Sequence, residues 1–257
     1  MTIHEQWIAF MTILRKEVKR FTRIWVQTLL PPAITMILYF VIFGKLIGAR
    51  IGEMSGFSYI DFVAPGLIMM AVITNSYANV SSSFFSAKFQ RSVEEILVSP
   101  TPHYVILLGF VMGGVARGMA VGLIVTLMSL CFTSLQVEHW FITVFIVLMT
   151  STLFSLAGFI NAIYANTFDD VSIVPTFILT PLTYFGGVFY SINLLPGFWQ
   201  QVSVFNPILH MVNAFRYGML GITDVHVGMA FAGLTLCVVV LFAVALHLLK
   251  TGKRLRA

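Results

Sequence analysis

Charge and cysteine are both scarce in this sequence. Only 10% of the 257 residues are charged and two are cysteines, whereas a soluble domain has about 25% charged residues. The shortage of charge excludes an ordinary soluble enzyme and a disordered chain, and the shortage of cysteine excludes a disulfide scaffold. In contrast, 58% of the residues are hydrophobic, in unbroken runs near the ~20 residues that a helix needs to cross a bilayer. These runs predict an all-α membrane protein, because a β-barrel would show shorter alternating segments.

Motifs for nucleotide binding and catalysis are also missing. The two Gly-Lys pairs are followed by Leu46 and Arg254 rather than by Ser or Thr, so neither completes a phosphate-binding P-loop. The sequence contains no G-x-S-x-G and no H-E-x-x-H pattern, and its six histidines are scattered. We therefore expect no enzyme activity, no cofactor and no metal site on this chain.

Hydropathy predicts one membrane domain over residues 1–257 with six spans. Residues 4–23 carry apolar side chains every three or four positions with basic side chains between them, which predicts an amphipathic helix in the membrane interface. Five spans are expected within 24–190, and a basic cytoplasmic tail at 250–257 follows the sixth. The six spans are placed at 24–46, 61–86, 104–134, 140–163, 171–190 and 226–249. Pro31-Pro32 must kink or restart the first of them.

The stretch 191–222 is too polar and broken for a span and too apolar for a free loop. It is punctuated by Pro196, Asn206 and Pro207, which predicts two short re-entrant helices that dip into the outer leaflet. Non-helical backbone is stable at that depth only where protein or a watery cavity covers it.

Lys and Arg are distributed unevenly along the chain. If both termini share one side of the membrane, eleven of the fifteen fall on that side and three on the other. This bias predicts that both termini are cytoplasmic. Basic side chains beside apolar spans indicate anionic lipid headgroups, rather than nucleic acid, as their partner.

The loop 88–103, KFQRSVEEILVSPTPH, joins the second and third spans on the predicted cytoplasmic side. Arg91 and Glu95 stand four residues apart and would face one another on a helix, and Pro100 and Pro102 would stop that helix before the third span. A short amphipathic helix on the membrane surface could be a docking point for a cytosolic partner or merely a solvated connection. The residues alone leave both interpretations open.

The pattern R-x-x-x-E-I-L-V-S-P in this loop resembles the coupling helix of ABC type-2 permeases. A basic amphipathic helix before the first span and a total of six spans agree with that family. So does the segment before the last span, in which Leu195-Pro196, Asn206-Pro207 and Arg216 resemble the outer re-entrant helices of the family.

The resemblance implies a homodimer in the bacterial inner membrane that binds two copies of a separate cytosolic ABC ATPase, with ATP and Mg on that partner. It also implies that ATP-driven closure reaches the permease through the coupling helix. The contact would then be formed by Arg91, Glu94, Glu95 and Pro100, with Asp169 and Asp170 of the next cytoplasmic loop as a second contact. Helix capping is the plainer role for these two aspartates.

Polar side chains inside the predicted spans are candidates for a translocation path. They are Asn75, Asn79 and Ser82 in the second span, and Thr180 and Thr183 in the fifth. Hydrogen bonding between helices is the alternative.

Three roles suit Arg117, the ionisable residue well inside a span: snorkelling, pairing with a carboxylate, or binding a lipid headgroup. Arg216 could cap the C-terminus of a re-entrant helix or face an anionic group at the outer exit.

The expected function is therefore that of the permease subunit of an ATP-driven exporter. Its substrate would be amphipathic or hydrophobic, such as a lipid, a glycan-lipid or a drug-like molecule, since the spans carry no charge cluster suited to a small ion. A self-contained secondary transporter would need carboxylates near the midplane, and the spans contain none. A membrane enzyme acting on lipid would need clustered His, Asp or Glu. A membrane scaffold without transport activity is also compatible with the loop 88–103.

Overall fold

The computed structural model describes residues 1–134 and 137–252, so residues 253–257 of the predicted basic tail lie outside the described residues. The described chain consists of helices, apart from a small hairpin of β1 (Glu53–Met54) and β2 (Phe57–Ser58). The helices before the hairpin are α1 (Ile3–Arg23), α2 (Trp25–Thr28), α3 (Leu30–Tyr39), the π-helical segment Phe40–Ile47 and α4 (Gly48–Ile51). The helices after it are α5 (Tyr59–Phe89), α6 (Ser92–Val98), α7 (His103–Ser129), α8 (Trp140–Tyr164), α9 (Phe168–Val174), the π-helical segment Pro175–Leu179, α10 (Thr180–Tyr184), the 3₁₀ turn Ile192–Leu194, α11 (Gly197–Val204), α12 (Pro207–Leu220) and α13 (Val227–Thr251).

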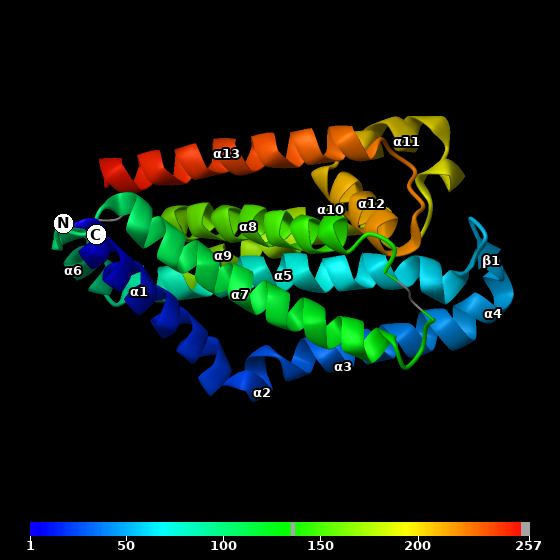
Figure 1. The fold of residues 1–257 in the computed structure, drawn as a ribbon, viewed down its shortest axis with the longest axis horizontal. Coiled ribbons are helices and arrows are strands. Elements are labelled where there is room, and N and C mark those ends of the chain that lie inside the picture. The colour runs from blue at the N-terminus through cyan, green and yellow to red at the C-terminus, as the bar shows by residue number, and fades with distance from the viewer. Residues whose placement is uncertain (135–136, 253–257) are drawn as a thin grey trace.

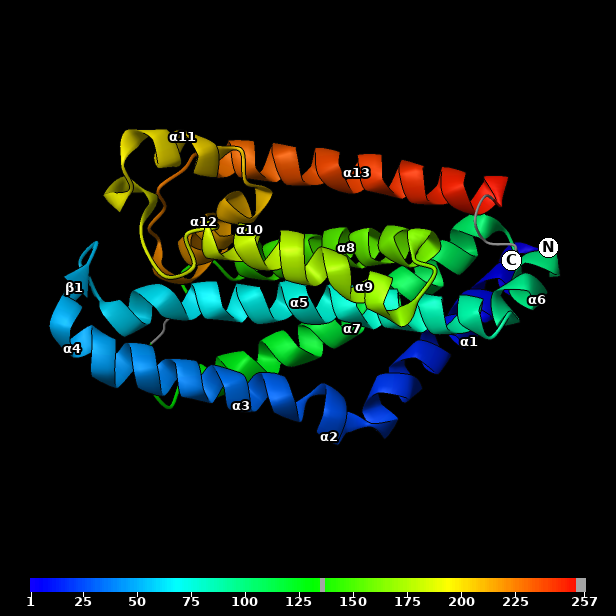
Figure 2. The same cartoon turned by 180° about the vertical axis from the view of Figure 1, so that it is seen from behind.

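The long helices form an elongated bundle around α5. Helices α7 and α8 pack along α5, α1 crosses α7, and α13 lies against α8. Figure 1 shows that the N-terminus, α6 and the last turn of α13 lie at one end of the bundle, and that α4, β1 and α11 lie at the other. The reverse view shows the chain from α9 to α10 running from the first end toward the second (Figure 2). We call these the terminal end and the hairpin end.

Within residues 1–134 and 137–252, five helical segments are long and apolar enough to cross a membrane. They are Trp25–Ile51, Tyr59–Phe89, His103–Ser129, Trp140–Tyr164 and Val227–Thr251, and they match five of the six predicted spans to within a few residues. The predicted fifth span, 171–190, is shorter: its helical part is the 17 residues Phe168–Tyr184. At ~1.5 Å per residue this part is about 25 Å long. It is short because the chain leaves the helix at Phe185 and turns at Gly187, which has φ +67°.

The first span is interrupted as its prolines predict. The backbone leaves helical geometry at Ile24, and Pro31-Pro32 lie in the first turn of α3. Proline is tolerated there because the first N–H groups of a helix have no intrahelical partner. The expectation of a restarted helix is confirmed, and the amphipathic segment 4–23 is the continuous helix α1.

The stretch 191–222 forms two short helices, α11 and α12, as expected. Pro196 precedes α11, and Asn206 and Pro207 begin α12. The two helices differ in burial: α12 is almost entirely buried between α5, α8 and α13, whereas much of α11 is exposed. Helix α12 is therefore part of the core of the bundle.

Helix α7 packs closely against its neighbours where it carries glycine. The spacing Gly114-Gly118-Gly122 predicts such close packing, because glycine has no side chain to hold two helices apart. A Cβ atom at Gly114 would lie 2.5 Å from a methyl of Val80 in α5, and one at Gly118 would lie 2.9 Å from the Ser151 hydroxyl in α8. These contacts place three long helices side by side and hold α5 at the centre.

Candidate functional site

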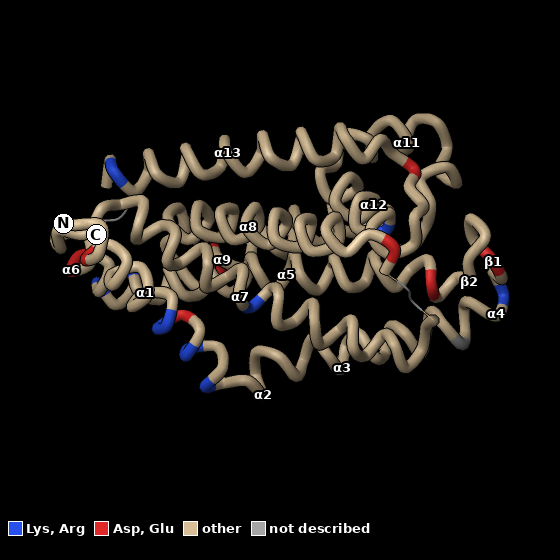
Figure 3. Tube along the Cα trace, in the orientation of Figure 1, with Lys and Arg blue, Asp and Glu red and all other residues tan. Residues whose placement is uncertain are grey.

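Helix α6 is an exposed helix at the terminal end, between α5 and α7. Its one buried side chain, Val93 at 2% exposure, fixes it to the bundle, while Glu94, Glu95 and Val98 face outward. The helix ends at Ser99, immediately before the exposed Pro100. Figure 3 shows acidic residues on α6 at the same end of the molecule as the basic residues of α1. The surface of α6 is thus an acidic and apolar knob.

Arg91 lies outside this helix, which corrects the expectation that it faces Glu95 across one helical turn. Arg91 precedes α6 in a left-handed conformation with φ 60°, because the chain reverses sharply after the end of α5. The described residues show no ion pair between Arg91 and Glu95. Both side chains are exposed at the terminal end.

The turn between α5 and α6 is tied to the end of α8 and the start of α9. The Lys88 ammonium donates hydrogen bonds to the carbonyl oxygens of Ile163 (2.6 Å) and Ala165 (2.8 Å), which are among the carbonyls that a helix end leaves without partners. The Phe168 ring packs against Phe85 and Phe89, with ring centroids 4.9 and 5.2 Å apart. The predicted contact residues of the two loops that were expected to be cytoplasmic therefore lie on one connected block.

Within that block, Asp169 and Asp170 have different surroundings. The Asp170 carboxylate accepts hydrogen bonds from the backbone N–H groups of Asn166 (2.9 Å) and Thr167 (3.0 Å), and the Thr167 hydroxyl caps α9 in return. These bonds from Asn166 and Thr167 lower the pKa of Asp170. Its capping role is confirmed. Asp169 is exposed beside Phe168 and stays a candidate contact.

The polar stripe of α5 points into the protein. Asn75 and Asn79 are buried, and their side-chain oxygens accept hydrogen bonds from Arg117 (3.0 Å) and Arg20 (2.9 Å). Ser82 is half-buried and bonds to the backbone of its own helix. The interhelical interpretation is the one that the geometry supports for the two asparagines, and neither borders an open path within the single chain. Arg117 is not paired with a carboxylate among the described residues; besides Asn75, it donates a hydrogen bond to the Thr28 carbonyl.

Glu17 is the residue that sequence reasoning missed. The sequence predicts an interfacial helix over 4–23 without a packing partner being named; in the structure α1 packs on α7, and Glu17 is 0% exposed. Its carboxylate accepts a hydrogen bond from the Ser83 hydroxyl (2.7 Å) and lies 3.4 Å from Nε of Arg20. One signal could have found it: a single acid among the five basic residues of 15–23. We refer to Glu17, Arg20, Asn75, Asn79, Ser83 and Arg117 as the polar junction.

The candidate path residues of the predicted fifth span lie on different faces of α10. Thr180 is exposed and Thr183 is buried, and both hydroxyls bond to backbone carbonyls of their own segment. Phe177 and Ile178 beside them are 73% and 52% exposed. This segment, like the first span, therefore presents an apolar face that the rest of the chain leaves uncovered.

Arg216 is a buried clamp at the hairpin end. The side chain is 1% exposed and stacks on the Phe62 ring at 3.9 Å. It donates hydrogen bonds to the carbonyls of Gly187 (2.8 Å) and Phe62 (3.3 Å) and to the Asn213 side chain (3.4 Å). Asn213 in turn accepts from the backbone N–H of Asp224 (3.1 Å). Arg216 thus bonds to a backbone carbonyl in the turn after α10 and to one in the first turn of α5. Neither carbonyl lies at the C-terminus of α11 or α12, so these bonds differ from the predicted cap of a re-entrant helix.

The Asn206-Pro207 motif links α12 to α10. The Asn206 side chain accepts from the N–H of Ile208 (3.0 Å) and donates to the carbonyl of Leu182 (2.6 Å). It therefore caps one helix and bonds to another. Pro196 makes no comparable contact: it is exposed and starts α11.

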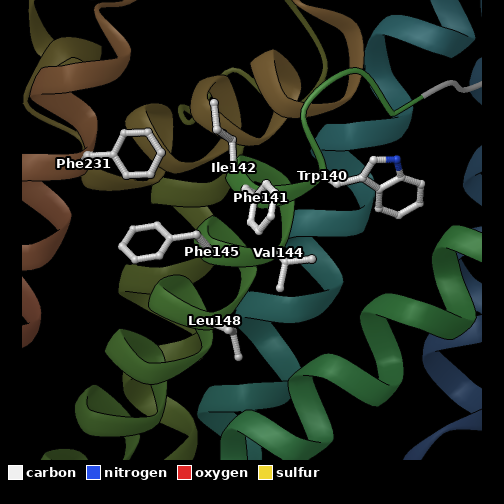
Figure 4. Close-up of a pocket in the computed structure, with 7 residues that line it drawn as sticks. All are labelled: Trp140, Phe141, Ile142, Val144, Phe145, Leu148 and Phe231. Carbon is white, nitrogen blue, oxygen red and sulfur yellow. The ribbon is translucent and has the colours of Figure 1, made fainter.

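A large apolar groove of about 720 Å³ lies between α8 and α13. Figure 4 shows its lining side chains, which are Trp140, Phe141, Ile142, Val144, Phe145, Leu148 and Phe231. A groove with so little polarity can hold apolar chains but cannot orient a polar substrate. Within the described residues, no group of three or more His, Cys, Asp or Glu side chains could hold a metal ion.

The fold defines a helical integral membrane protein with an exposed acidic helix, α6, at one end. The family model described as ABC-2 type transporter matches residues 8–220, and the chain belongs to this family. Membership of an ABC transporter family implies partnership with an ABC ATPase subunit.

Two curated relatives show how far the similarity extends. The chain is 56% identical over 255 residues to inner membrane transport permease YadH of Escherichia coli (strain K12), which covers 99% of this chain and 100% of the relative. It is 24% identical over 248 residues to nodulation protein J of Rhizobium meliloti (strain 1021), which covers 95% of this chain and 92% of the relative. The similarity therefore spans essentially the whole permease.

Proposed function

We propose that this chain is the permease subunit of an ATP-driven exporter in the bacterial inner membrane. Two copies pair as a homodimer and bind two copies of a cytosolic ABC ATPase, which carries the ATP and Mg²⁺. The observation that carries the proposal is the connected block at the terminal end. Helix α6 is exposed on one side and buries Val93 on the other. The end of α5 that leads into α6 is tied to α8 by Lys88 and to α9 by Phe168.

A partner that moves α6 would also move the rest of this block, because close contacts hold its parts together. Glu94, Glu95 and Asp169 supply exposed negative charge, and Arg91 and Pro100 border the knob. Charged rims of this kind steer a partner of complementary charge and fix its orientation. We infer that the ATPase presents basic side chains around an apolar pocket that takes Val98.

The homodimer would use the apolar faces that a single chain leaves uncovered. The first span and the segment Phe168–Tyr184 both expose large apolar side chains, including Leu46 at 65% and Phe177 at 73%. Pairing of two copies through these faces would place the path between them, with Thr180 on its wall. In this arrangement Phe168–Tyr184 and the turn after it complete the sixth crossing, and α11 and α12 form the outer re-entrant pair.

Six crossings put both termini on one side, and the terminal end carries the basic side chains of α1. The positive-inside rule then makes this end cytoplasmic. The substrate is inferred to be amphipathic or hydrophobic, because the uncovered faces and the α8–α13 groove are apolar.

Co-purification tests the proposal. The permease is extracted in mild detergent and the ATPase that accompanies it is quantified, for the wild type, for Glu95→Arg on α6 and for Glu53→Arg in β1. Both glutamates are exposed, but they lie at opposite ends of the bundle. We expect near-stoichiometric ATPase with the wild type and with Glu53→Arg, and loss of most of it with Glu95→Arg.

Recovery of the wild-type permease alone, folded and dimeric, would contradict the proposal and favour a scaffold or a self-contained transporter. Equal loss of ATPase in both variants would move the contact away from α6.

A further inference from the structure

The polar junction buries charge where α1 meets α5. Glu17 has no exposed surface, and its carboxylate contacts Ser83 of α5 and Arg20 of its own helix. A buried carboxylate is stable only when hydrogen bonds and a countercharge compensate for lost hydration. Arg20 completes the link by donating to the Asn79 carbonyl (2.8 Å) and to its side-chain oxygen (2.9 Å). Helix α1 is thus bonded to α5 through both members of an ion pair.

Arg117 extends the junction to the break in the first span. In a continuous helix the carbonyls of Gln27 and Thr28 would accept from residues 31 and 32, but both are prolines and lack an N–H. Arg117 of α7 donates to the Thr28 carbonyl (3.3 Å) and to Asn75 of α5 (3.0 Å). It therefore holds a carbonyl that the proline pair leaves without a donor, and joins the break to α5.

The close approach of α1 and α7 makes this contact rigid. A Cβ atom at Gly113 of α7 would lie 2.5 Å from Cβ of Glu17, and one at Gly109 would lie 2.6 Å from a methyl of Ile13. Two small residues one turn apart let α1 lie directly on α7. Neither helix can slide along the other without parting these contacts.

We propose that the polar junction makes α1, α5 and α7 move as one unit, so that a displacement of α6 reaches α1 and the first span at Pro31-Pro32. Glu17, Arg20 and Arg117 are positioning residues that act through α5. The transmission of motion rests on the proposed function, because it needs an ATPase that moves α6. The anchoring of α1 to α5 and α7 is independent of the proposed function.

Hydrogen exchange of the permease in lipid nanodiscs, without ATPase, tests the anchoring. Glu17→Ala and Ser83→Ala should speed the exchange of α1 amides by about tenfold or more, since each removes a hydrogen bond to a buried charge. Glu17→Gln, which keeps an acceptor for Ser83, should have a smaller effect. The matched controls are Arg15→Ala on the exposed face of α1 and Ser82→Ala, whose hydroxyl bonds to its own helix. Equal exchange of α1 in Glu17→Ala and Arg15→Ala would overturn the anchoring.

Distances between spin labels in the permease–ATPase complex test the transmission. Labels are placed at the exposed positions Thr12 of α1, Gln90 after α5 and His247 of α13, with the exposed Cys131 and Cys237 replaced by Ser. On ATP binding, both Thr12 and Gln90 should move relative to His247, while their own separation stays constant. In Glu17→Gln that separation should become nucleotide-dependent, which a purely structural role would not produce.

A wild-type separation between Thr12 and Gln90 that changes with nucleotide would overturn the transmission. So would a complex in which no distance responds to ATP. A permease that retains no ATPase would instead contradict the proposed function, and the exchange result would still decide whether the junction anchors α1.

Discussion

Replacement of Arg216 by Met tests the clamp at the hairpin end. The methionine keeps most of the apolar stem but removes the donors to the carbonyls of Phe62 and Gly187 and to the Asn213 side chain. Each buried acceptor left without a donor costs about 1–3 kcal/mol, and the loss of a desolvated cation offsets part of the total. We therefore expect a loss of roughly 4 kcal/mol in the free energy of unfolding.

Thermal unfolding in detergent, followed by intrinsic fluorescence, measures this loss. A change of that size should lower Tm by about 10 °C for a chain of this length. The control is Arg50→Met, which removes an exposed arginine at the same end of the molecule. A Tm for Arg216→Met within about 2 °C of the control would refute the clamp, because it corresponds to less than one hydrogen bond to a charged group.

Three further substitutions have expected outcomes. Lys88→Met should accelerate amide exchange across the α5–α6 turn and the end of α8 together, because the Lys88 ammonium bonds the turn to carbonyls at the end of α8; faster exchange in only one of them would contradict this. Gly113→Ala should destabilise the protein by about 1–3 kcal/mol through a clash with α1, whereas Gly233→Ala, with open space around it, should be neutral or stabilising. The thermal unfolding assay compares the two. Asn206→Ala should lose the cap of α12 and its bond to α10, about 1–2 kcal/mol by denaturant titration, and an unchanged midpoint would argue against the cap.

Local features of the chain were predictable because they depend on neighbouring residues. Apolar runs place five of the long helices, and Pro31-Pro32 places the restart of the first span. Thr167 with Asp170, and Asn206 with Pro207, carry the side chains that start α9 and α12. The loop 88–103 contains a helix that stops before Pro100, as expected, although the reversal at Arg91 removes that residue from the helix.

The predicted fifth span shows where hydropathy is insufficient. Its apolar residues continue to 190, but the backbone leaves the helix at Phe185 and turns at Gly187, whose positive φ brings it against Leu209 of α12. Hydropathy reports how favourably a segment enters lipid and not where its backbone turns. The same limit applies to α12, whose apolar residues belong to the core of the bundle.

Sequence alone determined that this chain is a helical membrane protein with a short amphipathic helix between its second and third spans, since hydropathy and periodicity are local properties. Only the tertiary structure decided which polar residues are buried and what they bind. Glu17 meets Ser83, Arg20 meets Asn79 and Arg117 meets Thr28 across 66, 59 and 89 residues of sequence. Those pairs exist because glycines of α7 let α1 pack against it, and the face that α1 buries depends on its partner helix as well as on its own sequence.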